Sequence, residues 1–251
     1  MKESEDTRPA YAEVAPPPAL RPFVEHLWVH RIEDPPPPEG RRLLPDGRVS
    51  FVWVSGLGVQ ISGPQTRYTR PPDVPRMLVF GATFRPGAAP HLLRTPASEL
   101  VNQHVALEAV DPRLAARIDA RLQHAADPRQ ALAAFADELE RRLRTVDGPD
   151  PAVNDAVRLL DHPTTSIAEV ATRAFVSERE LQRRFAEHIG YGPKTLQRVL
   201  RFQRFMQHIA VPRAELAGAA ALAGYTDQSH LTRETRRLAG LTPSRLRHWK
   251  H

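Results

Sequence analysis

Arg179, Gln182 and Arg183 are spaced so that, on a helix, all three side chains would share one face. Leu181 and Phe185 stand at i and i+4 and would point inward, which leaves those three side chains exposed. An arginine guanidinium can make paired hydrogen bonds to guanine, and a glutamine amide can make them to adenine. The chemistry offered by this face is therefore hydrogen bonding to base edges in a DNA groove.

A second copy of this stretch follows fifty residues later in the chain. LQRRFAEHIGYGPKTL (181–196) and LTRETRRLAGLTPSRL (231–246) are identical at five of 16 positions, including a glycine and a proline suited to helix ends. The outward positions of the second copy are Gln228, Ser229, Thr232 and Arg233. These side chains are shorter and less charged, so we expect fewer strong base contacts from them than from the first set.

Thr235 stands where the first copy has Phe185. An exposed threonine would be harmless there. An inward threonine would remove an aromatic anchor worth about 3 kcal/mol of packing, unless another side chain such as Leu238 or Trp249 fills the space. The second copy is therefore expected to be looser than the first, or to be filled from elsewhere.

Capped turns mark the helices that must position these side chains. Ser166 can cap the helix IAEVATRA, and Ser177 followed by Glu180 is a capping-box signature before SERELQRRFAEHI, which Gly190 can close. The second copy repeats this order with LAGAAALAG, Asp227 as N-cap, and QSHLTRETRRLA. A short helix, a turn and a second helix with exposed Arg and Gln predict helix-turn-helix units at about 166–190 and 216–240.

One long helix is expected to join the two units. It begins at Pro193 and holds about 17 residues, which gives it a length of roughly 25 Å. With the width of the flanking helices added, the two recognition helices could reach successive major grooves on one DNA face, roughly 34 Å apart. The helix N-termini at Pro193 and Pro243 would present free amides towards phosphates.

Charge and proline divide the chain into two parts of different character. Residues 151–251 hold 16 Lys and Arg against nine Asp and Glu, whereas residues 1–150 hold 19 against 20, so the positive excess lies in the C-terminal part. Of the 25 prolines, 20 precede residue 151, which favours strands and loops before it and helices after it. A basic part is typical of nucleic-acid binding, although a solvated arginine-rich surface would give the same balance.

Several classes of protein are excluded or disfavoured by what the chain lacks. It has no cysteine, so disulfides, thiolate zinc sites and cysteine nucleophiles are excluded. Its first 20 residues lack the apolar core of a signal peptide, and no run of 18 apolar residues occurs. We therefore expect a soluble, cytoplasmic protein without a membrane partner. We assign it no cofactor.

The N-terminal part predicts an antiparallel β domain followed by helices. RVSFVWVSG, LGVQISG and MLVFGATF are short β-branched and aromatic runs bounded by turn residues. Apolar residues then recur at helical spacing between residues 112 and 144. The predicted class is α+β with two domains. The expected division is a flexible arm (1–20), a β-rich domain (21–110), linker helices (111–147) and a helical DNA-binding domain (152–251).

The tandem pattern resembles the DNA-binding domain of the AraC/XylS transcriptional regulators. The first unit reads A-x4-V-S-x3-L-x-R-x-F before G-x2-P, and the second reads G-Y-x-D-x-S-H-L-x-R before G-L-T-P-S. The resemblance covers residues 152–249, and GYTDQSHLTR is its most specific string. LPDG (44–47) and G-x2-F-R-P-G (81–87) more weakly resemble a sensor domain similar to a cupin-like β-barrel.

What the resemblance implies is a one-component regulator, most simply an activator. Its N-terminal domain would bind a small-molecule effector or hold a homodimer, and would control how the C-terminal module engages promoter DNA and RNA polymerase. Base contacts would fall at Arg179, Gln182, Arg183, Gln228, Ser229, Thr232 and Arg233. Phosphate contacts would fall at Ser177, Lys194, Thr195, Ser244 and Arg245. Independently of the resemblance, Trp53, Phe84 and Arg85 are candidate effector contacts, with Arg85 a candidate anchor for an acidic ligand.

Two alternative functions stay open. The chain could be an effector-independent dimeric DNA-binding protein that dimerises through residues 112–144. A filled core of Phe51, Trp53, Phe80 and Phe84 would favour that function, whereas a hollow of several hundred Å³ would favour sensing.

A cupin-like metal enzyme fused to a DNA-binding module is the less favoured alternative. His26 and His30 are four residues apart and could share a face on a helix or in a strand, but no third ligand stands near them. The cupin-type signature of two His separated by one residue is absent. We therefore assign no catalytic residue and no metal ligand.

Overall fold

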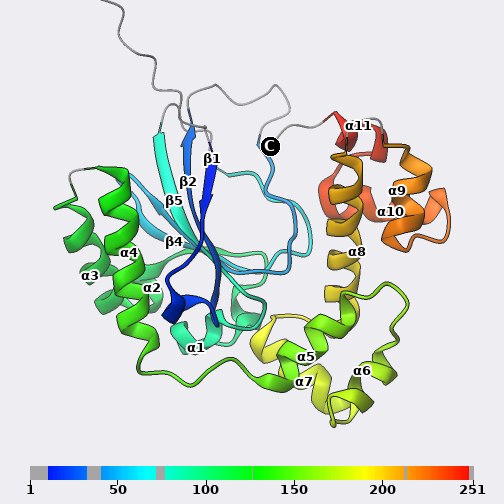
Figure 1. Cartoon of the computed structure of the whole chain (residues 1–251), viewed down its shortest axis with the longest axis horizontal. Coiled ribbons are helices and arrows are strands. Elements are labelled where there is room, and N and C mark those ends of the chain that lie inside the picture. Colours follow the sequence, from blue (N-terminus) through cyan, green and yellow to red (C-terminus); the bar gives the residue numbers. More distant parts are fainter. Residues whose placement is uncertain (1–10, 33–40, 72–76, 126, 212–213, 249–251) are drawn as a thin grey trace, which may run out of the picture.

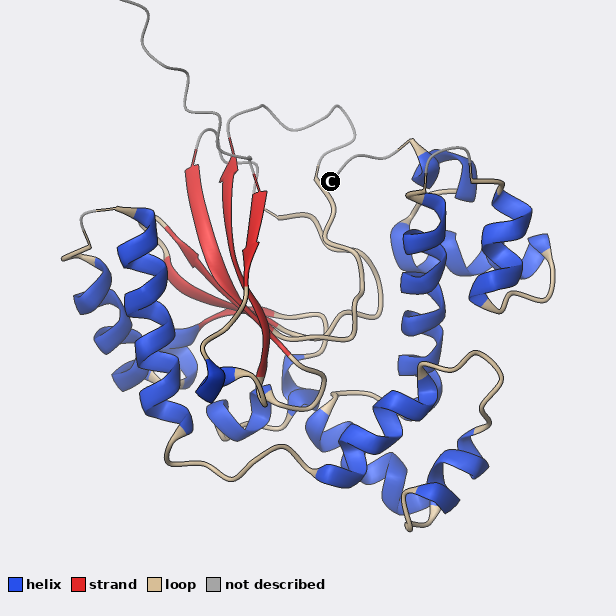
Figure 2. Cartoon of the chain, in the orientation of Figure 1, coloured by secondary structure: helices blue, strands red, loops and turns tan. Residues whose placement is uncertain are grey.

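The computed structural model describes residues 11–32, 41–71, 77–125, 127–211 and 214–248 (Figure 1). An antiparallel sheet with flanking helices comes first in the chain, and an all-helical part follows from residue 151 (Figure 2). Each part has its own cluster of buried apolar side chains. The predicted α+β class with two domains is confirmed.

Within the described residues, six strands form the sheet of the first domain. They are β1 (Tyr11–Val14), β2 (Val24–Ile32), β3 (Ser50–Val54), β4 (Gly58–Ser62), β5 (Met77–Phe84) and β6 (His104–Ala106). Every pairing is antiparallel, and the order across the sheet is β1-β2-β5-β3-β4-β6. Within the described ranges β1 and β6 are therefore the two edges. The tight turn from β3 to β4 depends on Gly56 and Gly58, which both have positive φ.

Helices cover one face of this sheet. They are α1 (Ala89–Leu93), α2 (Leu107–Val110), α3 (Pro112–Leu122) and α4 (Pro128–Leu143), with short 3-10 turns at Pro18–Leu20 and Ala97–Leu100. Asp111 and Asp127 cap α3 and α4 by accepting backbone N–H bonds in the first turn. The apolar stripes of α3 and α4 belong to the same buried cluster as the sheet. The two helices expected as linkers thus complete the first core.

Aromatic side chains fill the space between the sheet and α4. Phe51, Phe80 and Phe84 are fully buried, and the Phe80 ring lies 5.8 Å from that of Phe135 on α4. Trp53 stacks on Phe80 with ring centroids 4.8 Å apart. On this face of the sheet, these aromatic side chains pack against one another and form the core.

The helical part contains seven helices within the described residues. They are α5 (Pro151–Leu160), α6 (Ile167–Arg173), α7 (Glu178–His188), α8 (Pro193–Ile209), α9 (Leu216–Ala223), α10 (Gln228–Ala239) and α11 (Pro243–Arg247). The predicted N-caps are confirmed, because Ser166, Ser177 and Asp227 each accept a backbone N–H in the first turn of the following helix. No helix in the described ranges is long and apolar enough to cross a membrane.

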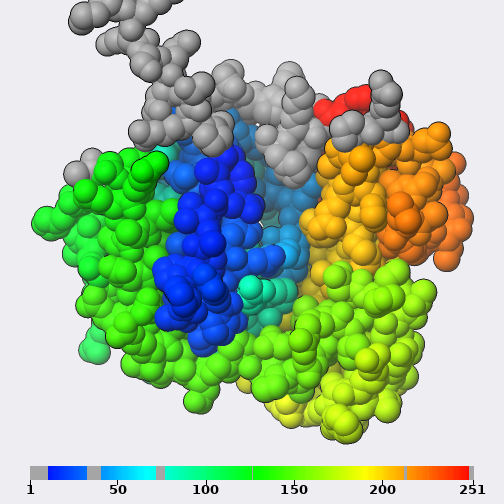
Figure 3. All heavy atoms as spheres, viewed as in Figure 1, coloured from blue at the N-terminus to red at the C-terminus, as the bar shows by residue number. Residues whose placement is uncertain are grey.

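The two domains lie against one another in the space-filling view, where the helical part, coloured from lime green to red, lies beside the blue-to-green first part (Figure 3). Loops that flank β3 and β4 make much of this contact. The Gln203 side chain of α8 donates a hydrogen bond to the Pro45 carbonyl, and Leu44 packs on the helical core. The His91 ring stacks on that of His188, the last residue of α7, with centroids 5.2 Å apart.

Candidate DNA-binding surface

The first helix-turn-helix unit consists of α6, a short turn and α7. The backbone N–H of Val176 bonds to the Ala171 carbonyl, and that of Phe175 bonds to the Thr172 carbonyl. This is the Schellman pattern, which places Phe175 in the left-handed region at φ 56°. Its side chain is 95% exposed. The turn therefore holds a large apolar residue in a conformation that favours glycine.

The orientation predicted for α7 is confirmed. Leu181 and Phe185 are fully buried, whereas Arg179, Gln182 and Arg183 are exposed on the opposite face. Their contact with DNA bases stays a prediction. Ser177 is exposed at the N-cap, where its hydroxyl accepts the Glu180 N–H.

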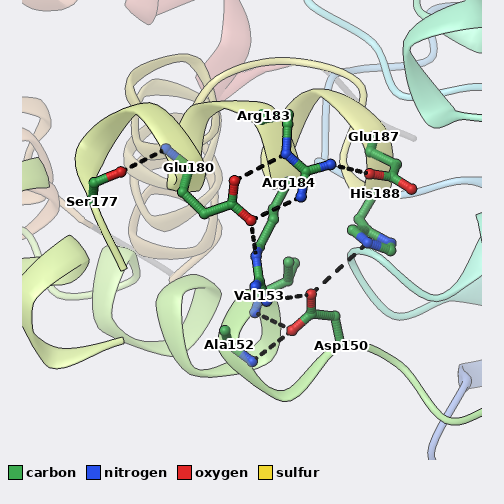
Figure 4. A network of polar contacts seen from close by, with 9 residues as sticks. All are labelled: Asp150, Ala152, Val153, Ser177, Glu180, Arg183, Arg184, Glu187 and His188. Carbon is green, nitrogen blue, oxygen red and sulfur yellow. Dashed lines mark hydrogen bonds and ion pairs between the residues drawn. The ribbon is translucent and has the colours of Figure 1, made fainter. Parts of the chain in front are cut away.

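Arg183 is held by carboxylates on both sides along α7 (Figure 4). Its Nε and Nη2 donate to the Glu180 carboxylate at 2.9 and 2.8 Å, and its Nη1 donates to Glu187 at 3.1 Å. The hydrogen bonds from Arg183 and Arg184 lower the pKa of Glu180 to about 2. Arg183 must exchange these partners to bind a base, and because the pairs are exposed to solvent they contribute little that this exchange would lose.

The same network ties α7 to the start of the helical domain (Figure 4). Arg184 donates to Glu180 at 2.8 Å and to Asp150 at 2.9 Å. Asp150 also caps α5, because its Oδ1 accepts the backbone N–H of Ala152. The i, i+3 and i, i+4 spacing of these acidic and basic residues was readable in the sequence, but the contact with Asp150 spans 34 residues.

The second unit consists of α9, a turn through Gly224 and α10. Gln228, Ser229 and Arg233 are exposed, and Thr232 is half-buried. Thr235 is fully buried and its hydroxyl donates to the Thr232 carbonyl at 3.2 Å. Of the two expectations for Thr235, exposed or pointing inward, the structure therefore shows the inward one. Leu238 is part of the buried core, as considered for this site, while Trp249 lies outside the described residues.

A buried acidic residue joins α10 to α8, and the sequence reasoning missed it. Glu234 accepts a bond from Arg198 Nε at 2.9 Å and lies 3.8 Å from Arg201 and 3.7 Å from His230. Its position beside Thr235 on the inward side of the helix was the available signal. This cluster fixes the second recognition helix on the long connecting helix.

The remaining phosphate candidates lie in the first turns of α8 and α11. Lys194 and Ser244 are exposed, as is Arg245, and Thr195 is half-buried. A helix N-terminus carries a partial positive charge, so both first turns favour an anion. The structure thus leaves these side chains at the surface, and their contact with phosphate stays a prediction.

Of the three residues predicted to bind an effector, two lie in the core of the first domain and one is exposed. Phe84 is fully buried, with its ring 5.0 Å from that of Phe51. Trp53 packs on Phe80 in the same core. Arg85 is exposed, and its Nε donates to the Arg21 carbonyl at 2.8 Å. A ligand that touched Phe84 would first have to displace core side chains.

Comparison with known families identifies the helical part. Residues 170–248, from α6 to the end of α11, match a family model described as a helix-turn-helix domain. This part is an AraC/XylS-type DNA-binding domain. An AraC/XylS-type domain binds double-stranded DNA, and the chain is accordingly a DNA-binding transcription regulator.

The other comparisons add little about the N-terminal domain. Residues 12–106, which span the sheet, match a family described as a domain of unknown function (DUF6597). No curated protein matches the chain.

Among solved structures, the chain is similar to two of ToxT. One is ToxT from Vibrio cholerae O395, with 10% identity and a TM-score of 0.47 over 88% of this chain and 95% of that one. The other is an apo lysine-to-alanine variant of ToxT from Vibrio cholerae strain SCE256, with 10% identity and a TM-score of 0.48 over 97% and 99%. At this level of likeness, neither structure says what this chain binds.

Proposed function

We propose that this regulator binds promoter DNA sequence-specifically, with α7 and α10 in successive major grooves of one DNA face. The observation that carries the proposal is the pairing of two helix-turn-helix units through the single 17-residue helix α8. A helix of that length separates the units by roughly 25 Å. The added width of α7 and α10 brings the span near the roughly 34 Å of one DNA turn.

Within this proposal the base-contacting side chains are those exposed on the two recognition helices. Arg179, Gln182 and Arg183 would make the stronger contacts, and Gln228, Ser229, Thr232 and Arg233 the weaker ones. Phosphate contacts from Ser177, Lys194, Thr195, Ser244 and Arg245 would fix the register without reading sequence. This division predicts that specificity depends mainly on α7.

The role proposed for the first domain is dimerisation and control of the DNA-binding domain. Its aromatic core is filled by Phe51, Phe80, Phe84 and Phe135, which supports effector-independent DNA binding as the second candidate function. An effector, if one controls the protein, would have to bind outside this core. Activation through contact with RNA polymerase belongs to the same proposal, and its test is transcription in vitro from a selected site.

The substitution Arg183→Ala tests whether α7 discriminates between DNA sequences. A duplex site would first be selected from a random library with the full chain. Arg183→Ala should then lose about 1–3 kcal/mol of discrimination between that site and random DNA. The matched control is Arg158→Ala, which removes an exposed arginine of α5 that forms an ion pair with Asp155 three residues away. Retained discrimination in Arg183→Ala would refute the assignment.

A further inference from the structure

One loop of the N-terminal domain touches the C-terminal ends of both recognition helices. We call residues 63–69, which follow β4, the brace. Near its start, the Asn102 N–H donates to the Pro64 carbonyl at 3.1 Å, and Thr66 N–H donates to the Asn102 side chain at 2.8 Å. Gln65 is buried and bonds to the Gly63 carbonyl. The brace is therefore a fixed segment of the first domain.

The first end of the brace meets α7 at Gly190. This glycine closes α7 with φ 99°, and a Cβ there would lie 2.9 Å from Pro64 Cγ and 2.8 Å from the Ala97 carbonyl oxygen. Pro64 and Ala97 are both buried. The close approach leaves no room for any side chain at position 190, so the contact is one of backbone against the first domain.

The other end of the brace meets α10 at Gly240. Tyr68 N–H donates to the Leu238 carbonyl at 2.6 Å, and Arg42 Nη1 donates to the Ala239 carbonyl at 3.1 Å. Both carbonyls lie in the last turn of α10, where no helical N–H is available to them. The Arg42 guanidinium also lies 4.4 Å from the centre of the Tyr68 ring, and its charge suits a helix C-terminus.

Arg42 and Tyr68 are held together by a short β-bridge next to them. Leu43 and Thr69 exchange two backbone hydrogen bonds, at 2.9 and 3.0 Å. A Cβ at Gly240 would overlap the Tyr68 ring and lie 2.9 Å from Arg42 Nη1. The first domain thus caps the second recognition helix with two residues whose mutual position is fixed.

Gly190 and Gly240 are the two copies of one repeated position, fifty residues apart, and the brace contacts both. We propose that the brace, with Arg42, is a positioning element that sets the distance and angle between α7 and α10. Tyr68 and Arg42 are its positioning residues. The consequence for DNA binding rests on the proposed function, whereas the positioning itself does not.

The absence of cysteine in the chain makes a direct distance measurement possible. Glu178→Cys on α7 and Arg237→Cys on α10 place spin labels at two exposed positions of the full chain. Without DNA, pulsed dipolar spectroscopy should give one narrow distance distribution. Adding Tyr68→Ala to the labelled protein should broaden or shift this distance distribution. If the Tyr68→Ala protein does not fold, Arg42→Ala takes its place. Tyr68→Phe keeps the ring, and Tyr11→Ala removes a half-exposed tyrosine of β1, so both controls should stay narrow.

The DNA test uses the selected site with one base pair inserted between the two half-sites. The insertion rotates one half-site by about 36° relative to the other. If α7 and α10 are held at a fixed distance and angle, the insertion should lower the affinity of the wild type for DNA steeply. In Tyr68→Ala the loss of affinity caused by the insertion should be about tenfold smaller, or about 1.4 kcal/mol. A merely structural role of Tyr68 would weaken binding to both duplexes equally.

The spin-label distances and the DNA affinities together distinguish a failure of the positioning role from a failure of the proposed function. A distance distribution that is unchanged by both Tyr68→Ala and Arg42→Ala would overturn the positioning role, whatever the DNA result. A broadened distribution in a protein that selects no DNA site would uphold the positioning role and refute the proposed function. Equal sensitivity to spacing in Tyr68→Ala and the wild type would show that positioning does not govern DNA binding.

Discussion

Phe175→Gly should make the protein more stable, although it removes an aromatic side chain. Phe175 occupies the left-handed position of the Schellman turn after α6, at φ 56°. In the second unit the same pattern of hydrogen bonds places Gly224 at that position, at φ 88°. The Phe175 side chain is 95% exposed, so it contributes little packing that the substitution could remove.

The expected gain is the difference between two opposing terms. A left-handed conformation costs an L-residue about 1–2 kcal/mol, which glycine avoids. Glycine in turn loses about 0.5–1 kcal/mol more backbone entropy on folding. At the midpoints of these two ranges the net gain is about 0.75 kcal/mol in the free energy of unfolding. For a chain of this size that corresponds to a rise in melting temperature of roughly 1–4 °C.

The assay is thermal and urea unfolding of the wild type, Phe175→Gly and Phe175→Ala. Alanine removes the ring but keeps the Cβ, so it retains the strain and should leave stability within about 0.5 kcal/mol of the wild type. If Phe175→Gly is no more stable than Phe175→Ala, the turn is not strained by its side chain and the reasoning fails.

Two further predictions concern the charged clusters. Glu234→Gln should lower the free energy of unfolding by about 3 kcal/mol, because it leaves Arg198 partly buried without a carboxylate; an unchanged urea midpoint would contradict this. The pKa of Glu180 in the folded protein is about 2, below its ordinary value. Its ion pairs should therefore stabilise α7 at pH values above the pKa of the unfolded chain, and this stabilisation should be lost as the pH falls through the folded pKa of about 2. NMR titration should show this low midpoint, and Arg183→Ala should raise it; a Glu180 midpoint near 4 in the wild type would contradict the ion pairing.

Local order in the helical domain could be predicted from the sequence because its signals lie within a few residues. The caps at Ser166, Ser177 and Asp227 were recognisable from residue type and spacing, and helical periodicity separated the buried Leu181 and Phe185 from the exposed arginines. The same rule gave the inward direction of Thr235 only as an alternative, because a threonine is compatible with either environment.

Contacts between distant segments could not be predicted in this way. The bond from Arg42 to Ala239 spans 197 residues, and no local pattern marks either partner. The periodicity of residues 112–144 indicated one buried face on each helix but not the surface that buries it. That surface is the sheet, so these helices belong to the first core. The order of the strands is likewise set by long-range pairing.

Hydroxyl-radical footprinting of the full chain on its selected duplex tests the central claim most directly. Two helix-turn-helix units on α8 should protect two tracts on one face of the DNA, with centres about 10 base pairs apart. Arg183→Ala should weaken protection in the tract bound by α7 before that bound by α10. A single protected tract, or two tracts on opposite faces, would contradict the account in which α7 and α10 occupy successive major grooves.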